Sequence, residues 1–150
     1  MSKFSILVIC YANYCRSPVG EKLLQDKYGN DVNVLSRGLI QYNSSSMDKR
    51  SLEYLEMKGL SNTTHIPKKV KKIDFDQADI VLTFDANLIL SLANLDRSLM
   101  QKVKLFTYAD NNEMIEDPYK FKDKKHYFKL MDKIFYAARK FDISFLKNLL

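Results

Sequence analysis

Tryptophan is absent from this sequence of 150 residues, which has only two cysteines, two histidines, three prolines and four glycines. Two cysteines five positions apart exclude a disulfide framework, and two distant histidines give no metal-ligand spacing. No apolar run approaches the roughly 20 residues of a membrane span, and the N-terminal apolar run is too short for the core of a signal peptide. We therefore expect a mature cytoplasmic protein without membrane insertion, bound metal or another cofactor.

The composition is that of an ordinary globular domain, with 46% hydrophobic and 28% charged residues. A chain of this length is typical of one domain with a core of its own, so we expect a single domain over residues 1–150. The formal net charge is +6, and lysines gather at residues 68–72 and 120–125. A positive net charge favours binding of an acidic or phosphorylated partner, and it is also compatible with weak binding to nucleic acid.

The chain is organised around residues 5–24, where an apolar run typical of a β-strand ends in Cys10. A short loop follows at residues 11–16. Ser17 then predicts an N-cap and Pro18 a first helical turn, because serine side chains accept helix N–H groups and proline lacks an N–H that would need a partner. The pattern predicts a strand, a loop and a helix in direct succession.

Such a loop is a candidate anion site. Its consecutive backbone N–H groups and those of the first helical turn form a concave, electropositive cradle. The planar guanidinium of Arg16 can hold two oxygens of a phosphate at once. Cys10 is expected at the floor of this cradle, where the same dipoles and charge favour the thiolate, which is the nucleophilic form of the side chain.

Strands and helices alternate along the rest of the chain. The other strands are expected at residues 32–36, 79–84 and 102–106. One helix is expected to end at Gly29, and a second to end at Gly59 with Leu52, Leu55 and Met57 on its apolar side. Further helices are expected at 87–95 and from 123, with a loop at 61–72. This order predicts an α/β fold with three layers, α/β/α, around a four-stranded parallel sheet. Ligands of such sheets bind at the carboxyl ends of the strands, where Cys10 and Ser36 lie.

The spacing Cys10-x5-Arg16, followed by Ser17, is typical of phosphatases that form a phosphocysteine. Its place after the first strand resembles the low-molecular-weight protein tyrosine phosphatases, whose loop reads C-x-G-N-x-C-R-S. The matching positions here are Cys10, Asn13, Cys15, Arg16 and Ser17. The resemblance implies that the whole loop holds the phosphate, including its variable positions Tyr11 and Tyr14. Ala12 stands where glycine is usual, so we expect strain if that position requires a positive φ.

A late D-P-Y motif, Asp117-Pro118-Tyr119, strengthens the resemblance because it precedes the last helix, as in the family. The resemblance implies that Asp117 protonates the departing oxygen and then activates water. Tyr119 is expected to flank the pocket and stack on a substrate ring. Tyr42 stands about where the family carries a specificity residue on the pocket wall.

Two further residues resemble supporting residues of the family. Ser36 resembles the serine whose hydroxyl props the phosphate loop, although Arg37 replaces the alanine that usually follows. His65 resembles the histidine that hydrogen-bonds the loop asparagine, here Asn13.

The resemblance implies a metal-free protein-tyrosine phosphatase that works through a phosphocysteine intermediate. The segment from residue 102 to Asp117 looks most like a bacterial branch associated with capsule and exopolysaccharide export. Those enzymes act on autophosphorylated tyrosine kinases, so a phosphotyrosine-containing protein of that kind is the implied partner.

Other interpretations stay open at this point. A thioredoxin-coupled arsenate reductase shares the loop and nucleophile but needs resolving cysteines, and none follows Cys15, so an external thiol would have to supply that step. A non-catalytic phosphate-binding module or a basic nucleic-acid binder requires neither a nucleophile nor an acid. The presence of Cys10, Arg16 and Asp117 together argues against both, and we expect no nucleic-acid partner.

Overall fold

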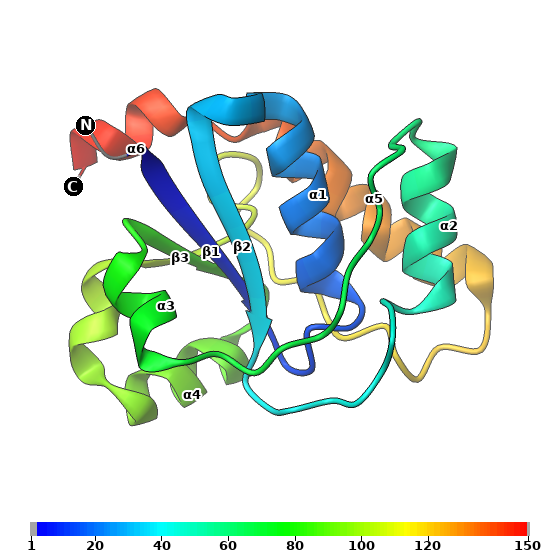
Figure 1. Ribbon diagram of the computed structural model, residues 1–150, viewed down its shortest axis with the longest axis horizontal. Helices are drawn as coiled ribbons and strands as arrows, with labels where there is room; N and C mark the ends of the chain where they lie inside the picture. Colours follow the sequence, from blue (N-terminus) through cyan, green and yellow to red (C-terminus); the bar gives the residue numbers. More distant parts are fainter. Residues whose placement is uncertain (1–2, 150) are drawn as a thin grey trace.

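The computed structural model describes residues 3–149, which form three layers, α/β/α (Figure 1). The central sheet has four parallel strands in the order β2-β1-β3-β4. The strands are β1 (Phe4–Cys10), β2 (Val32–Gly38), β3 (Ile80–Thr83) and β4 (Val103–Leu105). The predicted fold class is confirmed, and each strand overlaps the range predicted for it.

Helices cover both faces of this sheet. They are α1 (Arg16–Tyr28), α2 (Lys49–Met57), α3 (Lys72–Gln77), α4 (Ala86–Leu95), α5 (Lys124–Lys140) and α6 (Ile143–Leu149), with short 3-10 turns η1 (Gly29–Asp31) and η2 (Arg97–Gln101). Figure 1 shows α1, α2 and α5 on one side of the strands and α3 and α4 on the other. Among residues 3–149, no helix combines the length and the apolar character that crossing a bilayer requires.

Strand β1 explains why both faces are covered. Ile6 and Val8 belong to the larger core cluster, whereas Leu7 and Ile9 belong to the smaller cluster on the opposite face. Successive side chains of a strand alternate between the two faces, and all four are at most 2% exposed. A strand that is apolar on both sides belongs in the middle of a parallel sheet. Cys10, the last residue of β1, therefore lies at the centre of the carboxyl edge.

The start of α1 differs from the prediction. The helix begins at Arg16, and the N-cap residue is Cys15, which makes no side-chain capping hydrogen bond. Ser17, predicted as the N-cap, lies inside the first turn, and its hydroxyl contacts Cys10 and Asn13 instead. The N-terminal N–H groups of α1 are therefore left without a side-chain cap, which suits an anion site.

Three other helical details differ as well. The segment 61–72 is a loop as predicted up to Lys71, but the sequence did not predict α3, which begins at Lys72. At the start of α3, Asp74 accepts a hydrogen bond from the backbone N–H of Lys71 in a capping interaction. The C-terminal helical stretch is divided into α5 and α6, and Lys27 donates to three carbonyl groups where α5 ends. Met57, placed on the apolar side of α2, is 63% exposed, while Leu55 is fully buried.

Candidate active site

The loop between β1 and α1 has the polarity of an anion cradle. Most carbonyl oxygens of residues 10–15 are occupied. Those of Cys10, Tyr11, Asn13, Tyr14 and Cys15 accept hydrogen bonds from Leu39, Ile40, His65, Asp48 and Ser51 respectively. By contrast, within residues 3–149 no backbone N–H of residues 11–15 donates to a protein acceptor. Since backbone N–H groups need partners, these five groups are available to an anion in the manner of a backbone nest.

Asn13 gives the loop its shape. Its φ is 56°, in the left-handed region that asparagine tolerates better than most residues. From its buried side chain, Nδ2 donates to Ser17 Oγ (2.8 Å) and Ser36 Oγ (3.0 Å), and Oδ1 accepts from the Lys68 N–H (2.9 Å). The strain expected at Ala12 is not found, because within residues 11–15 the positive φ belongs to Asn13 alone.

Cys10 lies at the base of the loop and is 3% exposed. Its Sγ is 3.0 Å from Ser17 Oγ. Because Ser17 Oγ already accepts a hydrogen from Asn13 Nδ2, its own hydrogen is free to be donated to the sulfur. The arrangement therefore offers a hydrogen bond to a thiolate at this position.

Arg16 is buried and oriented by two acceptors. Its Nη1 donates to Asp85 Oδ2 (2.7 Å) and to the Ile115 carbonyl (2.8 Å). Within the described residues, Nε and Nη2 make no hydrogen bond, and Nη2 lies 4.0 Å from Asp117 Oδ2. One edge of the guanidinium is thus held by the protein, and the other edge is left for the two oxygens of a bound oxyanion.

A pocket of about 490 Å³ opens above this cradle. The residues that line it are Cys10, Tyr11, Ala12, Tyr14, Cys15, Arg16, Ile40, Tyr42, Asp117, Tyr119 and Lys120. The Tyr14 ring lies 4.7 Å from that of Tyr42 and 6.2 Å from that of Tyr119, measured between centroids. Three tyrosines therefore form a wall, and the 44% exposed Asp117 lies close to the guanidinium within the same cavity.

The remaining predicted residues lie beneath the loop. Ser36 accepts from Asn13 Nδ2 and donates to Glu21 Oε1 (2.8 Å). His65 Nε2 lies 2.8 Å from the backbone carbonyl of Asn13, so the contact implied by the resemblance is made to the main chain and not to the amide side chain. These two residues stabilise the loop from below and do not line the pocket.

His65 leads to a prediction about stability. Burial lowers its pKa below the ordinary value, outweighing the hydrogen bond to Asn13. As the pH falls below about 6.5, the unfolded chain takes up a proton that the folded protein resists, so acid favours unfolding. We expect H65Q to lose less stability than the wild type between pH 7 and 5, measured by urea unfolding. H126Q, at the exposed histidine of α5, is the matched control; an equal loss in all three proteins would contradict the prediction.

Sequence reasoning missed several residues that complete the site. Asp85, which was not assigned to the site from the sequence, holds Arg16, and its position directly after the β3 segment was the available signal. Gly38, the last residue of β2, was not assigned to the site either. A Cβ at Gly38 would come within 2.8 Å of Ala12 C and Asn13 N, so only glycine allows β2 to contact the loop this closely.

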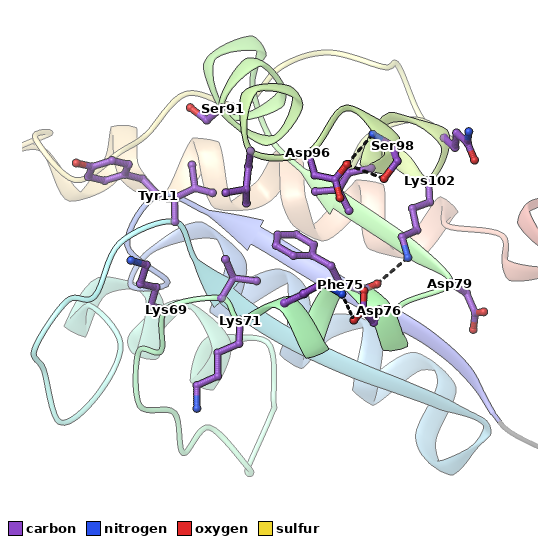
Figure 2. A pocket seen from close by; sticks show the side chains of 16 residues that line it. Tyr11, Lys69, Lys71, Phe75, Asp76, Asp79, Ser91, Asp96, Ser98 and Lys102 are labelled. Atoms are coloured by element: carbon purple, nitrogen blue, oxygen red, sulfur yellow. Dashed lines mark hydrogen bonds and ion pairs between the residues drawn. The ribbon is translucent and has the colours of Figure 1, made fainter.

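A larger hollow of about 1170 Å³ lies between α3 and the α4–η2 segment and shares Tyr11 with the pocket (Figure 2). Two of the lysines along it are occupied by internal contacts. Lys72 pairs with Asp76 at 2.9 Å, and Lys102 Nζ donates to the carbonyls of Phe75 and Ala78. Apart from Tyr11, no residue of the predicted site lines it, so the smaller pocket is the candidate active site.

The fold and the cradle together define an α/β domain with a site suited to an oxyanion above a cysteine. The family model described as "Low molecular weight phosphotyrosine protein phosphatase" matches residues 5–149. The chain belongs to this family, as the resemblance predicted.

Individual relatives agree with this assignment. The chain is 32% identical to the low molecular weight protein-tyrosine-phosphatase Wzb of Escherichia coli over 77% of this chain and 78% of that protein. It is 30% identical to the probable phosphatase AmsI of Erwinia amylovora over 77% and 80% of the two chains. The crystal structure of the Erwinia amylovora tyrosine phosphatase AmsI superposes with a TM-score of 0.84 and 28% identity, covering 93% of this chain and 91% of that chain.

Proposed function

We propose that this protein hydrolyses phosphotyrosine through a phosphocysteine intermediate without a metal ion. The observation that supports this proposal is a single pocket that holds the Cys10 sulfur, the oxyanion edge of Arg16 and the Asp117 carboxyl group. Binding a phosphate requires the cradle alone. A nucleophile below the phosphate and an acid beside it are what a displacement reaction needs.

In the first step the Cys10 thiolate attacks phosphorus, and the bond from phosphorus to the tyrosine oxygen breaks. The backbone N–H groups of residues 11–15 and the free edge of Arg16 hold the equatorial oxygens, where negative charge must be stabilised. Asp117, in its protonated form, transfers its proton to the departing phenolic oxygen. The products are tyrosine and a phosphocysteine.

In the second step water attacks the phosphocysteine. Asp117, now a carboxylate, takes a proton from that water, and the bond between sulfur and phosphorus breaks. The sulfur leaves as a thiolate, which the hydroxyl of Ser17 at 3.0 Å stabilises. Inorganic phosphate is released, and Asp117 is protonated again for the next cycle.

The tyrosine-lined wall favours an aromatic substrate. A phosphotyrosine ring can pack against Tyr42 and Tyr119 while its phosphate reaches the buried sulfur. Phosphoserine has a much shorter side chain, so its phosphate does not reach Cys10 while the peptide stays outside the pocket.

Parallel assays on a phosphotyrosine peptide, a phosphoserine peptide and arsenate test this function. We expect phosphate release from phosphotyrosine alone, with the same rate in excess EDTA. Arsenate reduction that depends on an added thiol, in the absence of phosphotyrosine hydrolysis, would support the alternative of an arsenate reductase with an external resolving thiol. Activity that requires a metal ion would contradict the proposal.

The physiological substrate we propose is an autophosphorylated bacterial tyrosine kinase in the cytoplasm. The support is the resemblance to the branch associated with capsule and exopolysaccharide export, together with the relatives named Wzb and AmsI. Incubation of such a kinase with the enzyme is expected to remove its phosphotyrosine signal on an immunoblot. An intact signal under conditions where phosphotyrosine itself is hydrolysed would exclude this substrate.

Cys15 is expected to make peroxide inactivation reversible. Burial raises the pKa of the Cys15 thiol above its ordinary range, so peroxide should react first at Cys10. The sulfenic acid formed there can condense with the Cys15 thiol, releasing water and forming a disulfide that a dithiol reduces. We expect wild-type activity to return after dithiothreitol, whereas C15S recovers far less of its own starting activity. Mass spectrometry without an intramolecular disulfide would refute this prediction.

A further inference from the structure

The loop that carries Asp117, residues 117–121, makes few hydrogen bonds. Its internal hydrogen bonds run from the Tyr119 N–H to Asp117 Oδ1 and from the Phe121 N–H to the Pro118 carbonyl. Within residues 3–149, the hydrogen bonds that reach the backbone of residues 117–121 from another part of the chain come from Arg50. Asp117 and Tyr119 are both exposed, whereas Pro118 is buried and Phe121 packs against the core. Apolar burial therefore anchors Pro118 and Phe121 but contributes little at Asp117 and Tyr119.

Arg50, in the first turn of α2, faces this loop from below. Its Nη1 donates to the carbonyl of Phe121, and its Nη2 donates to the carbonyl of Tyr119 at 3.2 Å. The guanidinium lies over the Tyr127 ring, with Cζ 4.1 Å from the centroid. Such a stack fixes the plane of the guanidinium and therefore the direction of its donors.

The same guanidinium is held by the carboxylate of Asp48. Nε donates to Oδ1 at 2.9 Å, and Nη2 donates to Oδ2 at 2.8 Å, which is a bidentate pair. Although burial of Asp48 opposes ionisation, its hydrogen bonds with Arg50 and the nearby positive charge lower its pKa overall. The pair is therefore ionised at neutral pH.

Asp48 in turn touches the phosphate loop. Its backbone N–H donates to the Tyr14 carbonyl at 3.0 Å, and its Oδ2 lies 3.8 Å from the Cys15 sulfur. Ser51, one residue beyond Arg50, donates to the Cys15 carbonyl at 2.9 Å. The start of α2 thus contacts the phosphate loop on one side and the Asp117 loop on the other.

We infer that Arg50 is a positioning residue, which holds the Asp117 loop in register with the phosphate loop. This inference rests on the proposed function of Asp117 and adds what places its carboxyl group near the departing oxygen. Displacement of a reacting group by about 1 Å can cost about 10²-fold in rate. A lysine cannot replace Arg50, because one ammonium cannot serve the Asp48 carboxylate and two separate carbonyls in a fixed plane.

Kinetics with R50K and R50M test this role. With phenyl phosphate we expect the single-turnover rate of phosphocysteine formation to fall by about 10- to 10²-fold, with a much smaller loss for an aryl phosphate whose phenol is strongly acidic. Phosphate binding is expected to change little, because Arg50 contacts no group that faces the phosphate. R139M is the matched control, since Arg139 is exposed on α5 and also lies near an aromatic ring, that of Phe135.

A double-mutant cycle shows whether Arg50 acts through Asp117. If it does, R50M/D117N should be no slower than D117N alone, because the group that Arg50 positions is already inactive. R50M leaves the buried Asp48 carboxylate unpaired and is expected to be destabilised. D48N/R50M removes both charges and keeps the comparison valid if R50M folds poorly. Multiplying losses, or equal losses for all leaving groups, would overturn the inference.

Hydrogen exchange gives a readout that does not depend on activity. Amides of residues 117–122 are expected to exchange faster in R50M and D48N/R50M than in the wild type, while those of α1 are unchanged. Unchanged exchange in the Asp117 loop would overturn the positioning role. A different outcome is faster exchange in the Arg50 variants together with no effect of D117N on the dependence of rate on leaving-group pKa. That outcome would refute Asp117 as the acid but would still support Arg50 as the residue that holds the loop.

Discussion

C10S is expected to lose turnover by about 10⁴-fold or more while still binding phosphate and vanadate. The serine hydroxyl is hardly ionised at neutral pH, so no nucleophile of comparable strength replaces the thiolate. The N–H groups of residues 11–15 and the guanidinium of Arg16 are unaffected by the exchange. Binding and chemistry should therefore separate in this variant.

Aryl phosphate turnover and calorimetric titration with phosphate measure the two effects. C15S is the matched control, because it makes the same exchange at the other buried cysteine and is expected to retain measurable turnover. Full activity of C10S, or activity restored by a metal ion, would end the phosphocysteine hypothesis. Loss of phosphate binding in C10S would show that the loop itself had collapsed.

D117N is expected to slow the hydrolysis of substrates whose leaving group needs a proton. For phenyl phosphate, whose phenol has a pKa of about 10, the loss should be about 10²- to 10⁴-fold. A strongly acidic phenol leaves as its anion without help, so phosphocysteine formation from its ester should change much less. The plot of single-turnover rate against leaving-group pKa should therefore become steeper.

Single-turnover rates for a series of aryl phosphates, wild type against D117N, provide the measurement. D110N is the matched control, since Asp110 lies in the same connection but pairs with Lys140 at 2.9 Å and does not line the pocket. Parallel lines for wild type and D117N would show that Asp117 is not the acid. Asp85 and Glu116 would then be the next residues to test.

Local pattern in the sequence was enough to predict the sheet and the phosphate loop. Residues 6–9 are apolar on both sides of a strand, and this property alone indicates a central strand of a parallel sheet. The spacing from Cys10 to Arg16 is set by one strand end, one loop and one helix start, so it is a local property. The predicted helix start at Ser17 was wrong because local pattern shows only that a serine hydroxyl can cap a helix. In the fold the same hydroxyl makes hydrogen bonds with Cys10 and Asn13 instead.

Contacts between distant segments could not be predicted in this way. Asp85 lies 69 residues from Arg16, and Arg50 lies 71 residues from Phe121, so neither pair leaves a periodic or spacing signal. The resemblance associated Asp117 with Cys10, but only the tertiary structure brings both into one pocket.

The sequence by itself determined which chemical groups this protein has and the order in which strands and helices present them. The tertiary structure decided which of those groups meet. Strand alternation and loop polarity arise from neighbouring residues, whereas the orientation of Arg16 and the register of the Asp117 loop depend on hydrogen bonds that form only after the sheet and helices have packed.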